Sequence, residues 1–150
     1  METKFNFKSQ ICTDKNQSER LLALGLKKET ADMHLQSTLN DVWSPYIPIA
    51  MPYSKVEAFN LNKDVFRIIP AWSLGRLVED LMPQTVTYRL NDYHLSLNLR
   101  EGMIGYFPPR LSARIRALEY FYGNDTILDD CISCIEWLIK EGYFNKEYLK

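Results

Sequence analysis

Long hydrophobic runs are missing from this sequence of 150 residues, because no stretch approaches the roughly 18 consecutive apolar residues of a membrane-spanning helix. Residues 1–8 also lack the apolar centre of a secretory signal. An excess of charge of one sign is missing as well. The net charge is −1, so no global field attracts nucleic acid or an anionic membrane. These absences predict a cytoplasmic protein without a membrane partner.

Cysteine and histidine are scarce as well. The sequence has three cysteines, Cys12, Cys131 and Cys134, and two histidines, His34 and His94. An odd number of cysteines favours a reducing compartment over a disulfide framework. A zinc site needs four ligands in tetrahedral geometry, and no second C-x-x-C or H-x-x-x-H pattern is present to supply them. We therefore expect neither a metal ion nor another cofactor.

Catalytic motifs are missing too, since the sequence contains no G-x-S-x-G elbow, no phosphate-binding loop and no H-E-x-x-H pair. The pair Cys131 and Cys134 lies inside a predicted helix and directly follows Asp129 and Asp130. Neighbouring carboxylates raise the pKa of a thiol and oppose a redox role. We interpret the pair as buried structural cysteine and expect no enzyme; an enzyme with an unrecognised site is the least favoured alternative.

The composition is typical of a globular protein, with 46% hydrophobic and 25% charged residues. The length favours a single domain that spans residues 1–150. Helices are predicted where apolar stripes at helical spacing follow capping residues. They are residues 17–24 behind Thr13 or Asp14, residues 74–82 behind Ser73, and residues 128–142 behind Asn124, Asp125 or Thr126. Gly25 and Pro83 follow the first two helices as stop signals.

An antiparallel β-meander is predicted after the second helix, because apolar and polar residues alternate in successive short runs. Its strands are expected at residues 86–90, 93–99 and 103–107, with turns at Asn91-Asp92 and at residues 100–102. One face is apolar and the other polar, which is the pattern expected when helices cover a single side. Residues 110–122 fit a helix or an edge strand, and their second half favours a strand.

The remaining segments are shorter. Residues 27–33 are polar and predict one further helical turn. Prolines interrupt residues 37–53, which predicts an extended backbone outside the centre of a sheet. The β-prone runs 55–59 and 65–69 predict a hairpin. Together these elements predict the α+β class: an antiparallel meander sheet of roughly three to five strands with two or three helices packed on one face.

A family resemblance rests on four segments: Ser18–Leu26, Glu29–Met33, Pro70–Pro83 and Cys134–Phe144. In this order they resemble the opening, middle and closing parts of a family of small uncharacterised proteins from gut Bacteroidetes, many of them encoded in phage-like or mobile regions. The matched residues are caps, apolar stripes and helix stops. The resemblance implies a bacterial origin and no particular activity, because that family has no established one.

The missing catalytic motifs and the resemblance favour a small accessory or regulatory protein that acts through a protein partner. Trp43, Tyr46 and Trp72 form the candidate partner surface, because exposed large apolar patches mark interfaces. The other interpretation is that these aromatic side chains simply cover the core, which is the commoner fate of large apolar residues.

Binding of nucleic acid is the alternative function. Arg110, Arg114 and Arg116 lie close together in the sequence and precede Tyr120 and Tyr122, so cations and stacking surfaces occur together. The opposing interpretation is a solvated basic edge. The near-zero net charge favours that interpretation, because neutralisation of phosphates dominates most nucleic-acid affinities.

Overall fold

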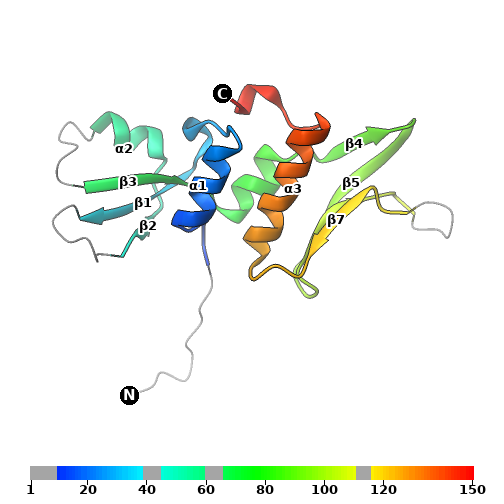
Figure 1. The fold of residues 1–150 in the computed structure, drawn as a ribbon, viewed down its shortest axis with the longest axis horizontal. Coiled ribbons are helices and arrows are strands. Elements are labelled where there is room, and N and C mark those ends of the chain that lie inside the picture. Colours follow the sequence, from blue (N-terminus) through cyan, green and yellow to red (C-terminus); the bar gives the residue numbers. More distant parts are fainter. Residues whose placement is uncertain (1–9, 39–44, 60–65, 111–115) are drawn as a thin grey trace, which may run out of the picture.

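The computed structural model describes residues 10–38, 45–59, 66–110 and 116–150, and in it helices lie between two antiparallel sheets (Figure 1). The first sheet has the order β2-β1-β3, with β1 (Met33–Thr38), β2 (Ile47–Ile49) and β3 (Phe66–Ala71). The second sheet is a meander in sequence order, with β4 (Thr85–Tyr88), β5 (Asn91–Asn98), β6 (Met103–Phe107) and β7 (Glu119–Tyr122). The helices are α1 (Lys15–Ala23), α2 (Tyr53–Phe59), α3 (Ile127–Glu141), the π-helix η2 (Arg76–Leu81) and the 3₁₀ turns η1 (Lys28–Thr30) and η3 (Lys146–Tyr148).

The predicted α+β class and the meander are confirmed, whereas the three-stranded sheet was not predicted. The predicted turn over 27–33 is present as η1, and the last strand of the meander, β7, lies in the second half of residues 110–122 as expected. Residues 111–115, in the first half of that segment, lie outside the described residues.

Capping side chains fix where the two long helices begin. Asp14 accepts a hydrogen bond from the backbone N–H of Gln17 at 2.8 Å, and the Gln17 side chain accepts one from the N–H of Asp14 at 3.0 Å. Thr126 and Asp129 make the same reciprocal pair at the start of α3. Both are capping boxes, which satisfy amides that the first helical turn leaves free. Gly142 ends α3 with a φ of 78°, a left-handed conformation that glycine adopts without strain.

The two capping boxes are also joined to each other. The Gln17 side-chain amide donates to Thr126 Oγ1 at 3.1 Å and to Asp129 Oδ1 at 2.8 Å, which ties the starts of α1 and α3 together. After the end of α1, Leu26 forms an antiparallel bridge with Leu149, and the N–H of Lys150 donates to the carbonyl of Gly25 at 2.8 Å. The start of α1 is therefore joined to the start of α3, beside which it lies (Figure 1), and the residues after α1 are joined to the last residues of the chain.

The predicted helix behind Ser73 forms, but most of it is a π-helix. Ser73 Oγ accepts from the N–H of Arg76 at 3.1 Å, and the N–H of Met82 donates to the carbonyl of Leu77 at 2.9 Å, five residues back. Leu77 and Leu81 are buried, as the apolar stripe predicted. Pro83 follows the helix and cannot supply the next N–H.

Two local predictions were wrong. Residues 55–59 belong to helix α2, since the N–H groups of Lys55 and Val56 donate to the carbonyl of Pro52. They therefore do not form a hairpin with the next strand, β3, which pairs with β1 instead. The tight turn lies at Arg89-Leu90, with φ of 48° and 67°, instead of at Asn91-Asp92. Cross-strand hydrogen bonds from Thr87 to Asp92 and between Thr85 and His94 favour the observed register.

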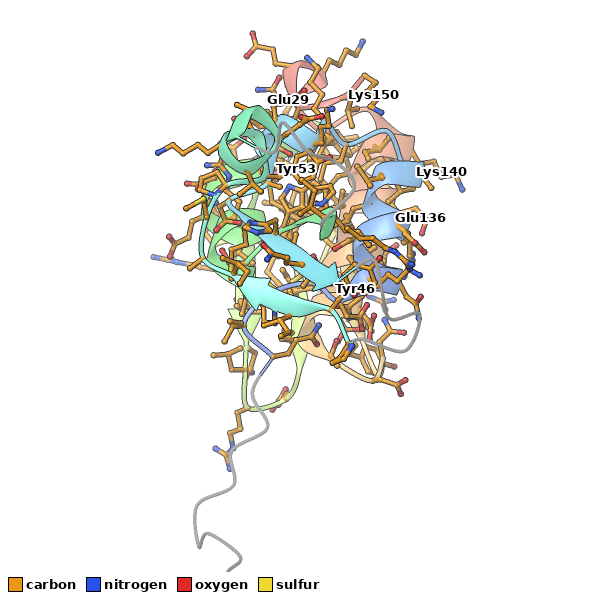
Figure 2. All side chains as sticks on the ribbon, turned by 90° about the vertical axis from the view of Figure 1, so that its left-hand side faces the viewer. Glu29, Tyr46, Tyr53, Glu136, Lys140 and Lys150 are labelled. Carbon is orange, nitrogen blue, oxygen red and sulfur yellow. The ribbon has the colours of Figure 1, made fainter. Side chains whose placement is uncertain are left out.

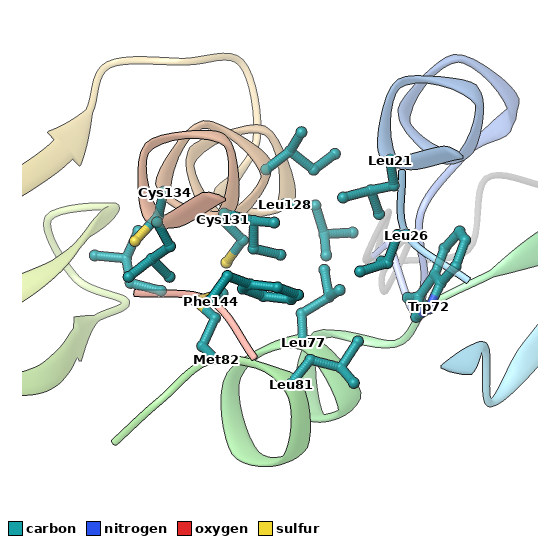
Figure 3. Close-up of a cluster of buried hydrophobic side chains, with 14 of the residues drawn as sticks. Leu21, Leu26, Trp72, Leu77, Leu81, Met82, Leu128, Cys131, Cys134 and Phe144 are labelled. Carbon is teal, nitrogen blue, oxygen red and sulfur yellow. The ribbon is translucent and has the colours of Figure 1, made fainter. Parts of the chain in front are cut away.

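The core lies where the helices meet, between the two sheets. Figure 3 shows Leu128, Cys131 and Cys134 of α3 opposite Leu77, Leu81 and Met82, with Phe144 among them. All three cysteines are free and buried, which confirms the interpretation of Cys131 and Cys134 as structural. Burial, with Asp130 alongside, raises the pKa of the Cys131 thiol to about 12, so this thiol stays protonated at neutral pH.

Candidate functional site

The two faces of the meander differ in what covers them. On the inner face, Ile104 and Tyr106 are fully buried, and the rings of Tyr106 and Phe121 lie 6.0 and 6.3 Å from the ring of Trp137 on α3. The outer face carries the alternate residues of the same strands, and it lies at the edge of the molecule, away from α3 (Figure 1). The inner face therefore holds the fold together, and the outer face is open to a ligand.

Three aromatic rings form a continuous row on this outer face; we call Phe107, Tyr120 and Tyr122 the aromatic row. The Phe107 and Tyr120 ring centroids are 6.3 Å apart, with planes 30° apart. The Tyr120 and Tyr122 centroids are 5.7 Å apart, with planes 15° apart. Tyr120 is 46% exposed and Tyr122 is 64% exposed, so the row offers aromatic surface to solvent instead of contributing to the core.

Gly105 allows the two strands beneath the row to approach each other. It pairs with Tyr120 across β6 and β7, and a Cβ atom added at Gly105 would lie 2.6 Å from the Tyr120 Cβ and 2.5 Å from the Glu119 carbonyl oxygen. Real Cβ atoms essentially never come this close to a neighbour. A glycine is therefore required at this position, and it sets the place of the row's central ring.

The other half of the outer face is polar. On β4 and β5 the outward residues include Thr85, Thr87, Asp92 and His94. Thr87 donates to Asp92 Oδ1 at 2.6 Å, and Thr85 Oγ1 lies 3.2 Å from His94 Nδ1, so these side chains are held in place. His94 is the cross-strand neighbour of Phe107. The face thus combines a polar half that can form hydrogen bonds with a half that can stack flat rings.

The predicted arginine cluster lies at one end of the aromatic row. Arg110 follows Phe107 by three residues and Arg116 precedes β7 by three, and the two strands are antiparallel, so both arginines lie at the Phe107 end. Both are exposed. Arg114 lies outside the described residues. The structure therefore brings Arg110 and Arg116 to the same end of the hairpin as the row, which is what a surface for an anionic, ring-bearing ligand requires.

The candidate partner surface of Trp43, Tyr46 and Trp72 is wrong in one member. Trp72 is 0% exposed: its backbone N–H donates to Thr13 Oγ1 and its indole N–H to Thr30 Oγ1, both at 3.0 Å. It lies at the junction between the three-stranded sheet and the helices, so it packs in the core instead of meeting a partner. Trp43 lies outside the described residues.

Tyr46, directly before β2, is half-buried and packs against the small core cluster of Cys12, Met33, Leu35 and Ala71 (Figure 2). It lines a cavity of about 450 Å³ together with Cys12, Leu35 and other residues, and the Lys15 ammonium lies 5.6 Å from its ring centroid. Burial, with Asp32 and Asp14 nearby, raises the pKa of the Cys12 thiol to about 11. The Cys12 thiol is therefore protonated at neutral pH and does not provide the cavity with a thiolate nucleophile.

Among the described residues, no group of three or more histidine, cysteine, aspartate or glutamate side chains is arranged to bind a metal ion. In the same part of the chain, every helix is too short or too polar to cross a membrane. No protein-family model, curated protein or solved structure matches this chain. The resemblance to the Bacteroidetes family stays a prediction.

Proposed function

We propose that this protein is a non-enzymatic accessory factor that binds single-stranded nucleic acid on the outer face of its meander. The observation that carries the proposal is the exposed aromatic row with Arg110 and Arg116 at one end. Bases stack on aromatic side chains of single-strand-binding proteins, with about 1–3 kcal/mol lost per base when the ring is removed. Arginine supplies the cation for the phosphate backbone.

The spacing of the rings favours a single strand over a duplex. Neighbouring centroids in the row are 6.3 and 5.7 Å apart, whereas bases within one strand of a duplex rise by only about 3.4 Å. One base per ring is therefore achieved only by an unstacked, extended strand. In a duplex, each base is also covered by its stacked neighbours, so the aromatic row would find no exposed base face to contact.

The charge balance limits how much phosphates contribute. The net charge of the chain is −1, and the described members of the predicted arginine cluster are Arg110 and Arg116. Each phosphate contact to a single strand contributes about −0.7 to the slope of log K against log salt, so two contacts give a slope of about −1.4. Stacking therefore supplies most of the affinity in this proposal, and binding does not require a strongly basic surface.

Fluorescence anisotropy with a labelled oligothymidine of about 12 nucleotides tests the proposal directly. We expect binding to the single strand, weaker binding to the matching duplex and a shallow salt slope. Tyr120→Ala should lower the affinity about 5- to 150-fold, the range that corresponds to about 1–3 kcal/mol. Tyr88→Ala is the matched control, since Tyr88 is 39% exposed and lies outside the aromatic row.

No binding at low salt, or equal losses in both tyrosine variants, would overturn the proposal. Arg110→Ala and Arg116→Ala should each reduce the salt slope by about 0.7. The charge control is Lys55→Ala, because Lys55 is exposed on α2, a helix that packs against the three-stranded sheet. A slope much steeper than about −3 in the unaltered protein would show that other cations dominate the binding.

A second candidate function is a protein-interaction module of phage or mobile-element origin, with its partner at the edge of the three-stranded sheet. The observation that favours it is the cavity of about 450 Å³ beside Tyr46, near two apolar side chains, Ile11 and Ile47, that are each 57% exposed. Affinity capture from the native host distinguishes the two functions. A partner that survives nuclease and is lost with Ile47→Asp, but not with Tyr120→Ala, would support this alternative.

A further inference from the structure

A hollow of about 330 Å³ lies where the aromatic row ends. It is lined by Leu90, Asn91, Asp92, Pro108, Pro109 and Arg110. His94 pairs with Phe107, and extending that register by two residues sets Asp92 opposite Pro109, so the hollow adjoins the Phe107 end of the row. Two residues along an extended chain span about 7 Å, close to the spacing within the row. A strand that places one base on each ring would reach the hollow with its next base.

The walls of the hollow combine flat apolar surface with fixed polar groups. Pro108, Pro109 and Leu90 supply the apolar surface. Asp92 supplies a carboxylate, whose Oδ1 already accepts from Thr87 Oγ1 at 2.6 Å and is thereby oriented. A carboxylate offers about four lone-pair sites, so one bond from Thr87 leaves it able to accept from a ligand. Arg110 supplies a cation at the rim.

We infer that this hollow selects a guanine base from the single strand that the proposed function places on the row. Guanine is the one standard base whose Watson–Crick edge presents two adjacent N–H donors, the N1–H and the 2-amino group. A carboxylate accepts such a pair through both oxygens, as it accepts the two parallel N–H groups of arginine. Thymine, uracil and cytosine present carbonyl or ring acceptors beside their donors, and these repel the Asp92 carboxylate.

The size and charge of the hollow agree with this ligand. A volume of about 330 Å³ lies at the lower end of the range of roughly 300–1,000 Å³ found for small-molecule sites, which suits one base instead of a longer segment. Arg110, on the same wall, suits the phosphate that follows the base. Single-stranded recognition commonly reads a splayed base by its Watson–Crick edge while neighbouring bases stack.

The test uses five-nucleotide oligothymidines in which a single guanine replaces thymine at each position in turn. A short oligomer limits sliding, so we expect guanine at one terminal position to raise the affinity about tenfold, which corresponds to about 1.4 kcal/mol. Inosine at that position lacks the 2-amino group and should lose most of the gain. Asp92→Asn should abolish the gain, measured as the ratio of the affinities for the guanine-containing and the plain oligothymidine.

Glu19→Gln is the matched control, because Glu19 is an exposed carboxylate on α1, outside the meander. It should preserve the guanine preference. If the protein binds oligothymidine but gains nothing from guanine at any position, or if Asp92→Asn keeps the gain, the guanine site is refuted and the proposed function stands. If plain oligothymidine does not bind at all, the proposed function itself fails.

Discussion

Tyr106 and Tyr120 lie on neighbouring strands of one sheet, but the first packs in the core and the second faces solvent. Tyr106 is 0% exposed, packs against Trp137, and donates its hydroxyl proton to the carbonyl of Pro83 at 2.6 Å. Tyr120 is 46% exposed and stacks on Phe107 and Tyr122 of the outer face. The pleat alone separates them, because successive side chains of a strand point to opposite faces. Stability and binding can therefore be altered independently in this sheet.

The largest effect is expected on the inner face. Tyr106→Ala removes a fully buried ring and leaves the Pro83 carbonyl without its donor, so it should cost about 3–5 kcal/mol in the free energy of unfolding. Leu138→Ala, in the part of α3 that packs in the core, should cost about 2–5 kcal/mol. Urea unfolding followed by circular dichroism measures both. Losses below about 0.5 kcal/mol would mean that the inner face does not hold the core.

Alkaline pH should weaken the same inner face. Burial raises the pKa of Tyr106, with Cys134 beside it, well above the ordinary tyrosine value, and it raises the pKa of Cys131 to about 12 from 9.0. Above pH 9 the unfolded chain releases protons that the folded chain keeps, so the free energy of unfolding falls as pH rises. The slope is at most about 1.4 kcal/mol per pH unit for each group.

Urea unfolding at pH 7.5, 9 and 10.5 checks this expectation. Cys131→Ala should flatten the decline between pH 9 and 10.5, whereas a substitution on the outer face, such as Thr85→Val, should leave it unchanged. Constant stability over this range would contradict the burial of these groups.

Gly105 connects the two faces, and its substitution should have an intermediate effect. Gly105→Ala brings a methyl group to within 2.5 Å of the Glu119 carbonyl oxygen, so β6 and β7 must move apart. We expect a loss of about 1–3 kcal/mol in the free energy of unfolding, as for other overpacked sites. Affinity for oligothymidine should fall as well, because the row is displaced. Gly102→Ala is a useful contrast: its Cβ meets nothing within 4 Å, although its φ of 62° still causes strain.

The smallest effect on stability is expected on the outer face. Tyr120→Ala should change the free energy of unfolding by no more than about 0.5–1 kcal/mol, since an exposed aromatic pair contributes little beyond its stacking. The same variant should lose most of its affinity for single strands. A stability loss as large as that of Tyr106→Ala would end the distinction between the two faces, and the aromatic row would then be a structural element.

Local patterns in the sequence predicted the elements that short-range physics determines. The caps at Asp14 and Thr126, both among the candidate caps, the stops at Gly25 and Pro83 and the alternation in β5 and β6 each depend on residues within a few positions of one another. The end of α3 at Gly142 was not predicted as a stop. The three-stranded sheet was not predicted because β1 pairs with β3 across 27 residues that include β2 and α2, and nothing local in residues 33–38 indicates that partner. Residues 55–59 have β-prone members, and the helix-start signal at Pro52 was overlooked.

The candidate site was predictable in its residue types but not in its arrangement. The sequence pattern indicated Tyr120, Tyr122 and the arginines because these residues lie close together in the sequence. Phe107 joins them only through the register of β6 and β7, which a single sequence does not determine. Trp72 was misplaced for the same reason, since its burial depends on Thr13 and Thr30, which are 59 and 42 residues away. The glycine opposite Tyr120 was the one overlooked signal, because glycine within a strand often marks a close approach.

The clamp that joins α1 to the last segment has a consequence for the order of folding. Gln17 bonds to Thr126 and Asp129, and Lys150 bonds to Gly25, so part of the surroundings of α1 comes from residues more than 100 positions later. During synthesis, the start of α1 can meet the end of β3 first, through the hydrogen bonds between Thr13 and Trp72, whereas α3 and the C-terminal residues can join only later. Contacts of such wide separation slow folding. The pairing of α1 with α3 is therefore one of the last contacts that the growing chain can make.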